Sequence, residues 1–101
     1  MDENDVAESA TYQSVERALA LLTSFDETRT ELGVTEMASL LGVHKSTASR
    51  LAATLERAGL LVRYGRRYRL GFEVIRLGTL ALQSFDLIAS MQAAMVMSTG
   101  R

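Results

Sequence analysis

Apolar residues recur along much of this chain at the spacing of an α-helix. Five of them repeat in this way early in the chain and predict a first helix from an N-cap at Ser14 to about Ser24: Val15, Ala18, Leu19, Leu22 and Phe25. A second helix is expected at about residues 36–41, with Thr35 as its N-cap. Residues 32–34, just before it, are compatible with a very short strand.

The stretch between Gly42 and Gly59 predicts a third helix, at about residues 44–58, with two distinct faces. One side of its helical wheel is apolar and suits a core: Ala48, Leu51, Ala52 and Leu55. The opposite side carries small or basic residues: Ser46, Ser49, Arg50, Ala53 and Arg57. Small side chains allow a helix to approach base edges closely, and arginine can bond guanine with two hydrogen bonds. This helix alone is equally compatible with an ordinary solvated surface.

Alternating residues between Leu60 and Leu70 predict a β-hairpin that turns around Gly65. The alternating apolar positions are Leu60, Val62 and Tyr64 on the first strand and Tyr68 and Leu70 on the second. Four arginines lie between them or at the tip, with no acidic residue among them: Arg63, Arg66, Arg67 and Arg69. A basic hairpin after a helix pair is typical of a wing, which reaches a phosphate backbone or a minor groove. The sequence therefore predicts a mainly α fold with a small β-hairpin, a winged helix-turn-helix.

Two further apolar helices are expected after the hairpin, at 72–85 and 87–97. The first is apolar on more sides than a small domain can cover: Phe72, Val74, Ile75, Leu77, Leu80, Leu82 and Phe85. A second protomer or a second domain is expected to cover these side chains. The chain ends directly after the second of these helices, which favours a fragment of a longer protein.

Charge is distributed unevenly although the chain of 101 residues has a net charge of only −1. Nine acidic and two basic residues precede position 41, whereas residues 44–76 contain eight basic and two acidic residues. A phosphate partner responds to the local basic surface rather than to the sum. The acidic residues 1–11 are expected to form a disordered tail.

Several kinds of chemistry are not expected. The chain has no cysteine, a single histidine (His44), no glycine-rich phosphate loop and no cluster of metal ligands, so neither an enzyme nor a cofactor is predicted. No apolar stretch is long enough to span a bilayer, and residues 1–11 lack the apolar core of a secretory signal. The absence of cysteine fits a reducing compartment, and a cytoplasmic location is expected.

Three segments resemble the DNA-binding domain of the IclR family of bacterial transcriptional regulators. They are SVERALALL at residues 14–22, VTEMASLLGVHKSTASRLAATLERAGLL at 34–61 and RRYRLG at 66–71. The resemblance covers about residues 12–100. Two positions depart from the family pattern: Arg66 stands where many members have glycine, and His44 where proline is frequent. Both departures bear on base preference or wing reach rather than on the fold.

The resemblance implies a domain order and a set of partners. Residues 12–71 would form the DNA-binding domain, 72–85 a linker and dimerisation helix, and 86–101 the start of a truncated effector-binding domain. Family members bind double-stranded operator DNA as homodimers or dimers of dimers. They sense a small-molecule effector through the C-terminal domain, most of which this chain does not include.

The resemblance also implies which residues contact DNA. The recognition helix would supply Lys45, Ser46, Thr47, Ser49 and Arg50, with Thr35 before the second helix and Arg66 and Arg67 in the wing. Arg50 and Ser46 are expected to read bases, and Lys45 to hold a phosphate. Thr47 lies near the core edge of the wheel and is equally compatible with a half-buried structural role. A winged-helix module that binds protein instead of DNA remains the alternative function.

Overall fold

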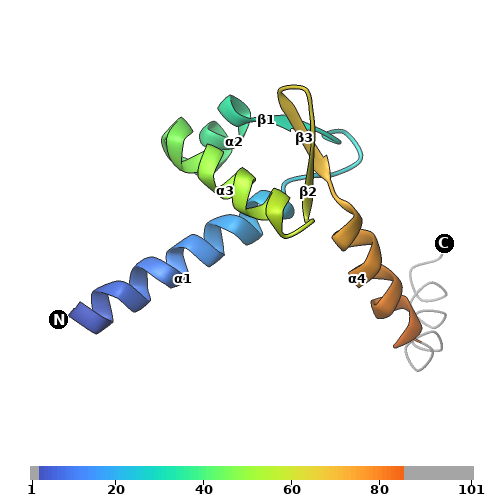
Figure 1. Ribbon diagram of the computed structural model, residues 1–101, viewed down its shortest axis with the longest axis horizontal. Coiled ribbons are helices and arrows are strands. Elements are labelled where there is room, and N and C mark those ends of the chain that lie inside the picture. The colour runs from blue at the N-terminus through green and yellow to red at the C-terminus, as the bar shows by residue number, and fades with distance from the viewer. Residues whose placement is uncertain (1–2, 86–101) are drawn as a thin grey trace, which may run out of the picture.

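The computed structural model describes residues 3–85 of the chain, and side-chain burial from residue 9 onward. Its elements in chain order are α1 (Glu3–Leu22), β1 (Leu32–Gly33), α2 (Val34–Leu41), α3 (Lys45–Arg57), β2 (Leu61–Tyr64), β3 (Arg67–Leu70) and α4 (Phe72–Gln83). Figure 1 shows α2, α3 and the small sheet forming the body, with α1 and α4 leaving it in diverging directions. The helix expected at 87–97 and the expected domain start at 86–101 lie outside the described residues.

The three strands form one antiparallel sheet in the order β1-β3-β2. In β2–β3, Tyr64 pairs with Arg67, so Gly65 and Arg66 alone form the turn. Gly65 has a φ of 61° and no other residue type in the described chain has a positive φ. Positive φ at the first turn residue only is the geometry of a type II′ hairpin, which matches the twist of the two strands. The predicted wing is therefore confirmed, together with the short strand before α2.

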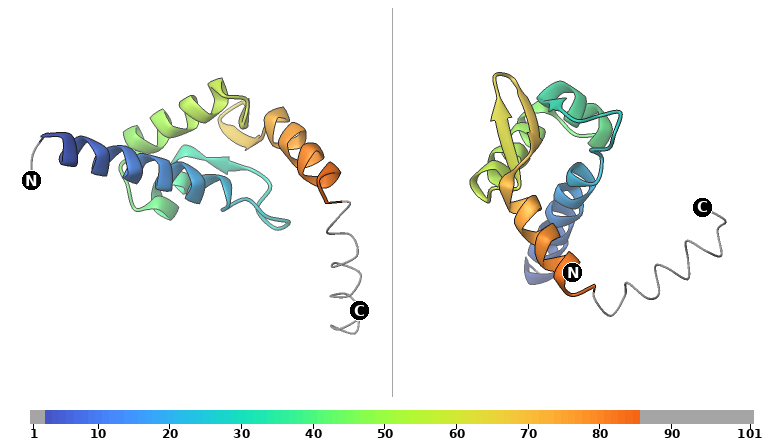
Figure 2. Two further views of the ribbon diagram at one scale, coloured as in Figure 1. Left: turned by 90° about the horizontal axis from the view of Figure 1, so that it is seen from below. Right: turned by 90° about the vertical axis from the view of Figure 1, so that its right-hand side faces the viewer.

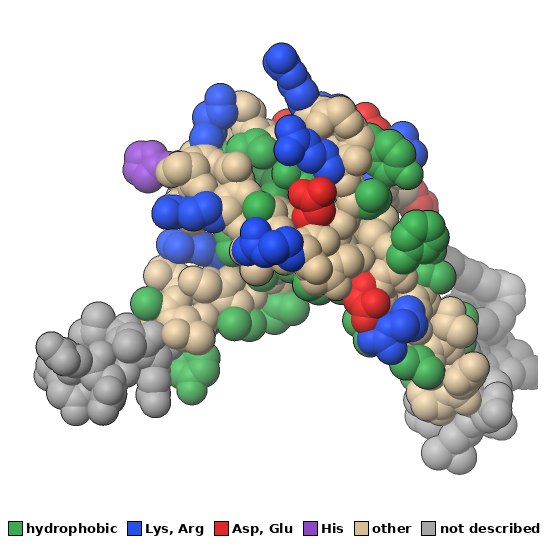
Figure 3. Space-filling model, in the orientation of Figure 1, with side chains coloured by type: hydrophobic (Ala, Val, Ile, Leu, Met, Phe, Trp, Pro, Cys, Tyr) green, Lys and Arg blue, Asp and Glu red, His purple; other side chains and the backbone are tan. Residues whose placement is uncertain are grey.

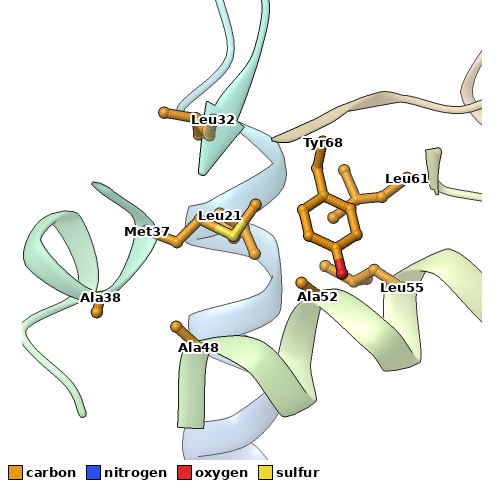
Figure 4. Close-up of a cluster of buried hydrophobic side chains, with 9 residues drawn as sticks. All are labelled: Leu21, Leu32, Met37, Ala38, Ala48, Ala52, Leu55, Leu61 and Tyr68. Carbon is orange, nitrogen blue, oxygen red and sulfur yellow. The ribbon is translucent and has the colours of Figure 1, made fainter. Parts of the chain in front are cut away.

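A small core lies where α1, α2, α3 and the sheet meet (Figure 4). Its buried side chains are Leu21, Leu32, Met37, Ala38, Ala48, Ala52, Leu55, Leu61 and Tyr68. Three of the four stripe residues predicted on α3 are among them, and Leu51 is half-buried. In the hairpin the burial differs from the simple alternation, because Leu61 and Tyr68 face the core while Tyr64 and Leu70 are exposed. The pairing of Leu32 with Tyr68 places both of these side chains on the core face of the sheet.

The first helix begins earlier than the apolar spacing indicates. It was expected to start at Ser14 after a disordered acidic tail, but α1 extends back to Glu3. Ser14 is not an N-cap. Its hydroxyl donates instead to the carbonyl oxygen of Ala10, 3.1 Å away, which is how a serine is accommodated inside a helix. No glycine or proline interrupts residues 3–13, and without such a break nothing stops the helix at Ser14.

The second helix also begins earlier than expected, and Thr35 is not its N-cap. The cap residue is Gly33, and Thr35 lies within the first turn of α2. The carboxylate of Glu36 accepts the backbone N–H of Gly33 at 3.0 Å, which satisfies a donor that the helix leaves free. The end of α2 is as predicted, because Gly42 has a φ of 65° and its N–H bonds back to the last turn.

The linker helix α4 follows the wing directly and is held at its first turn. The N–H of Gly71 donates to Leu60 at 2.8 Å, and the N–H of Glu73 donates to Gly59 at 3.0 Å. Beyond this turn α4 leaves the body (Figure 2) and contains no buried residue. Its exposed apolar side chains are Phe72, Ile75, Leu77, Leu80 and Leu82. The expectation that this helix presents apolar surface which the other described residues leave uncovered is confirmed.

Candidate nucleic-acid interface

Helix α3 presents an outward edge with an open hollow on each side. Its buried stripe packs on the core, so the residues diametrically opposite face away from the protein. Ser46 and Arg57 lie on this outward edge and are exposed. Figure 3 shows basic side chains gathered over the end of the molecule that contains α3 and the hairpin. The surface predicted to face DNA is therefore both accessible and basic.

The first hollow lies between α3, the start of α2 and the hairpin, and we call it the wing hollow. Ten residues line it: Gly33, Val34, Thr35, Glu36, Lys45, Ser49, Arg63, Arg66, Arg67 and Tyr68. Five of the eight residues predicted to contact DNA are among them, although they come from three separate parts of the sequence. The first turns of two helices, α2 and α3, contribute Thr35 and Lys45. Helix N-termini favour anions through their free N–H groups and their dipoles.

The second hollow lies between α1 and α3, and we call it the α1–α3 groove. Its lining residues are Ser14, Val15, Arg17, Ala18, Thr47, Arg50, Leu51 and Thr54. The structure thus separates the predicted contacts of the recognition helix: Lys45 and Ser49 line one hollow, and Thr47 and Arg50 line the other. Thr47 is half-buried, which agrees with its place near the core edge of the wheel.

Arg67 differs from the other predicted wing contact because its charge is already engaged. Its guanidinium lies 3.0 Å from the carboxylate of Glu31 and 2.7 Å from that of Glu36. Glu31 also pairs with Arg69 at 3.0 Å, and Arg69 lies 5.1 Å from the ring centroid of Tyr64. We call the four charged residues Glu31, Glu36, Arg67 and Arg69 the wing clasp. The clasp ties β3 to the segment before α2 and to the first turn of α2.

The hydrogen bond from Gly33 and the charge of Arg67 keep the pKa of the Glu36 carboxyl below its usual value. The backbone N–H of Gly33 is the larger of these two effects, and the Arg67 guanidinium adds to it. Glu36 is therefore ionised at neutral pH, and its negative charge inside the wing hollow is balanced by Arg67. The other basic side chains of the hollow, Lys45, Arg63 and Arg66, make no ion pair among the described residues, so their charges can attract an anion.

Three predicted contacts carry cations that make no ion pair within the described part of the chain: Lys45, Arg50 and Arg66. Lys45 occupies the first position of α3, where the helix dipole disfavours a positive charge. Arg57, on the outward side of α3, donates to the hydroxyl of Thr54 at 3.2 Å. Glu73 pairs with Arg76.

His44, the single histidine of the chain, is the exposed N-cap residue of α3.

Sequence reasoning missed three kinds of participant. Arg17 was not among the predicted contacts, yet it lines the α1–α3 groove beside Arg50. Arg63 lines the wing hollow, and Glu31 and Glu36 hold Arg67. A lone arginine at position 17 in a segment otherwise rich in acids was a usable signal for the first. Nothing local in the sequence indicates the contact between Glu31 and Arg67, which lie 36 positions apart.

The helix pair α2 and α3, the left-handed turn at Gly42 between them and the basic β2–β3 hairpin together define a winged helix-turn-helix of the DNA-binding type. A sequence profile described as the IclR helix-turn-helix domain matches residues 14–65. The chain belongs to the IclR family and contains its DNA-binding domain. It is thus a regulator domain rather than an enzyme.

Relatives agree with this assignment. The transcriptional regulator XynR of Escherichia coli K12 is 39% identical over 77 residues, which cover 74% of this chain and 31% of XynR. The glycerol operon regulatory protein of Streptomyces coelicolor is also 39% identical, over 76% of this chain and 31% of its own. Among solved structures, a candidate IclR regulator from Silicibacter sp. TM1040 superposes with a TM-score of 0.71. It is 36% identical, over 79% of this chain and 32% of that one.

These figures also define the extent of the match. The chain spans about a third of the length of the relatives that it matches. In the described region no helix is both long and apolar enough to cross a membrane. Within residues 3–85 no group of three or more histidine, cysteine or acidic side chains is placed to hold a metal ion.

Proposed function

We propose that α3 enters the major groove of operator DNA and that the β2–β3 wing contacts the adjacent backbone or minor groove. The observation that carries this proposal is the position of the outward edge of α3 between two basic hollows. A helix in the major groove lies between two phosphate backbones, and each hollow faces one of them. Ser46, exposed on the edge itself, faces the base edges.

Within this arrangement we assign different roles to the recognition residues. Arg50 and Ser46 read bases, because both are exposed and Arg50 lies at the boundary between the outward edge and the α1–α3 groove. Lys45 and Ser49, together with the first turn of α2 at Thr35, hold a phosphate in the wing hollow. Thr47 faces the other hollow.

The two wing arginines have different roles in this proposal. Arg66 contacts the DNA backbone, since it is exposed at the turn and makes no ion pair within residues 9–85. Arg67 positions the wing through the clasp, because a phosphate would have to displace two carboxylates from its guanidinium. This refines the sequence-based expectation that both arginines contact DNA directly.

We also propose that the protein works as a homodimer or a dimer of dimers in the cytoplasm. The support for self-association is α4, where Phe72 is 83% exposed and Leu82 is 70% exposed in the single chain. Large apolar side chains at such exposure are typical of a surface that a second copy covers. The relatives are longer than this chain and have room for an additional domain. We propose that a full-length protein with such a domain senses a small-molecule effector.

Fluorescence anisotropy with the purified chain tests the proposal. A random duplex pool is titrated at several salt concentrations, and bound sequences are selected and amplified. We expect steeply salt-dependent binding and an enriched, roughly palindromic motif. Arg50→Ala should cost about 1–3 kcal/mol on the enriched motif and much less on random duplex. A folded chain that binds no duplex at low salt would overturn the proposal and favour a protein-binding winged helix.

A further inference from the structure

The α1–α3 groove contains two arginines that have no partner among the described residues. Arg17 comes from α1 and Arg50 from α3, and neither makes an ion pair or a side-chain hydrogen bond in the described chain. Arg17 is half-buried, so part of its hydration is lost without a compensating contact. This contrasts with Arg67, Arg69 and Arg76, whose carboxylate partners are all present. The groove therefore has an excess of positive charge that no side chain of residues 9–85 neutralises.

The remaining groove residues fit an anion rather than an apolar ligand. The hydroxyl of Thr47 is unengaged among the described residues, whereas those of Ser14 and Thr54 donate to backbone carbonyls at 3.1 and 2.8 Å. Two guanidinium groups facing one groove repel each other unless an anion lies between them. Val15 and Leu51 provide an apolar base on which the arginine stems can lie.

The position of the groove identifies the anion. It flanks α3 on the side opposite the wing hollow, because its α3 residues and those of the wing hollow lie on either side of the outward edge. When α3 lies in the major groove, one backbone passes the wing hollow and the other passes the α1–α3 groove. We propose that this groove binds a backbone phosphate of operator DNA, with Arg17 as its principal cation and the Thr47 hydroxyl as a second donor.

This inference rests on the proposed function and adds α1 to the DNA interface. Arg17 and Arg50 share the groove but differ in their roles. Arg50 lies next to the outward edge and reads a base, while Arg17 approaches from a different helix and can meet only the backbone. Arg17 consequently contributes charge without sequence information, and it fixes the angle at which α3 enters the major groove.

Salt titrations with the 101-residue chain test the inference. Binding to the selected duplex and to random duplex is measured by anisotropy for the wild type, Arg17→Gln, Arg17→Lys and the control Arg29→Gln. Arg29 also loses one charge on substitution, but it bonds the carbonyl of Ser24 outside both hollows. Circular dichroism confirms that each variant is folded, and Thr47→Val provides a second test should Arg17→Gln not fold.

We expect Arg17→Gln to make the negative slope of log K against log salt shallower by about 0.9, which corresponds to the loss of one phosphate contact. At 0.1 M salt this corresponds to about eightfold weaker binding, equal on selected and random duplex. Arg17→Lys should retain the slope. Thr47→Val should weaken binding a few fold and leave the slope unchanged. If the slope for Arg17→Gln equals that of the wild type and of Arg29→Gln, this inference is wrong but the proposed function still stands. A wild-type chain that binds no duplex would overturn the proposed function as well.

Discussion

Gly71 lies where the wing joins α4, and we predict that Gly71→Ala strongly destabilises the domain. The backbone of Gly71 has ordinary dihedrals, with φ −94° and ψ 178°, so the reason is purely steric. A Cβ at this position would lie 2.4 Å from the carbonyl oxygen of Gly59 and 3.1 Å from two backbone carbons. These are backbone atoms, which cannot rotate away as a side chain can.

The magnitude follows from what must move. Overpacking of this kind costs about 1–3 kcal/mol. Separating the two backbones also lengthens the bonds from Gly71 to Leu60 and from Glu73 to Gly59, each of which contributes about 1 kcal/mol. We therefore expect a loss of about 3 kcal/mol, which lowers the melting temperature by about 12–24 °C in a domain of this size.

Thermal unfolding followed by circular dichroism measures this effect, at one protein concentration for all variants because self-association would shift the midpoint. Gly78→Ala is the matched control. Gly78 lies inside α4, and a Cβ there would meet nothing within 4 Å, so alanine should stabilise the helix by about 0.5–1 kcal/mol. If Gly71→Ala melts within two or three degrees of the wild type, our account of this junction is wrong.

Two further predictions concern the wing. Arg66→Gln should leave thermal stability unchanged but reduce the steepness of the salt slope of DNA binding by about 0.9. Arg67→Gln should instead lower thermal stability, because it breaks the clasp. Equal melting curves for the two variants would contradict this difference. The contribution of Glu36 should depend on pH: the folded-state pKa of its carboxyl is lowered, so the stabilisation is present above the usual value of 4.5 and is lost as the pH falls through the folded-state value. Acid unfolding curves of the wild type and Glu36→Gln should therefore diverge above that range and converge below it, and parallel curves would count against the interaction.

Most of the secondary structure could be predicted from the sequence because it depends on local signals. The apolar stripe of α3 has a helical period, and Gly42 and Gly59 end their helices with φ values of 65° and 80°. The same local reasoning failed at the starts of α1 and α2. Ser14 and Thr35 are good N-cap residues by type, but a cap needs a chain that leaves the helix there. Both residues lie inside their helices, which begin at Glu3 and Val34.

The candidate site was predictable in its residue types but only partly in its grouping. The outward face of α3 and the basic wing follow from periodicity and charge. The division of the recognition residues between two hollows does not, because it depends on where α1 and the wing pack against α3. For the same reason Arg67 was expected to be free, and its two carboxylate partners were unforeseen.

The sequence by itself determined the order of helices and strands, the two-sided character of α3 and the basic hairpin. These properties depend on residues within a few positions of each other, so their periodicity records them directly. Tertiary structure alone decided that Leu32 pairs with Tyr68, that Glu31 neutralises Arg67, and that Arg17 shares a groove with Arg50. Contacts between residues more than thirty positions apart leave no periodic signal, because they arise only when the core has brought their elements together.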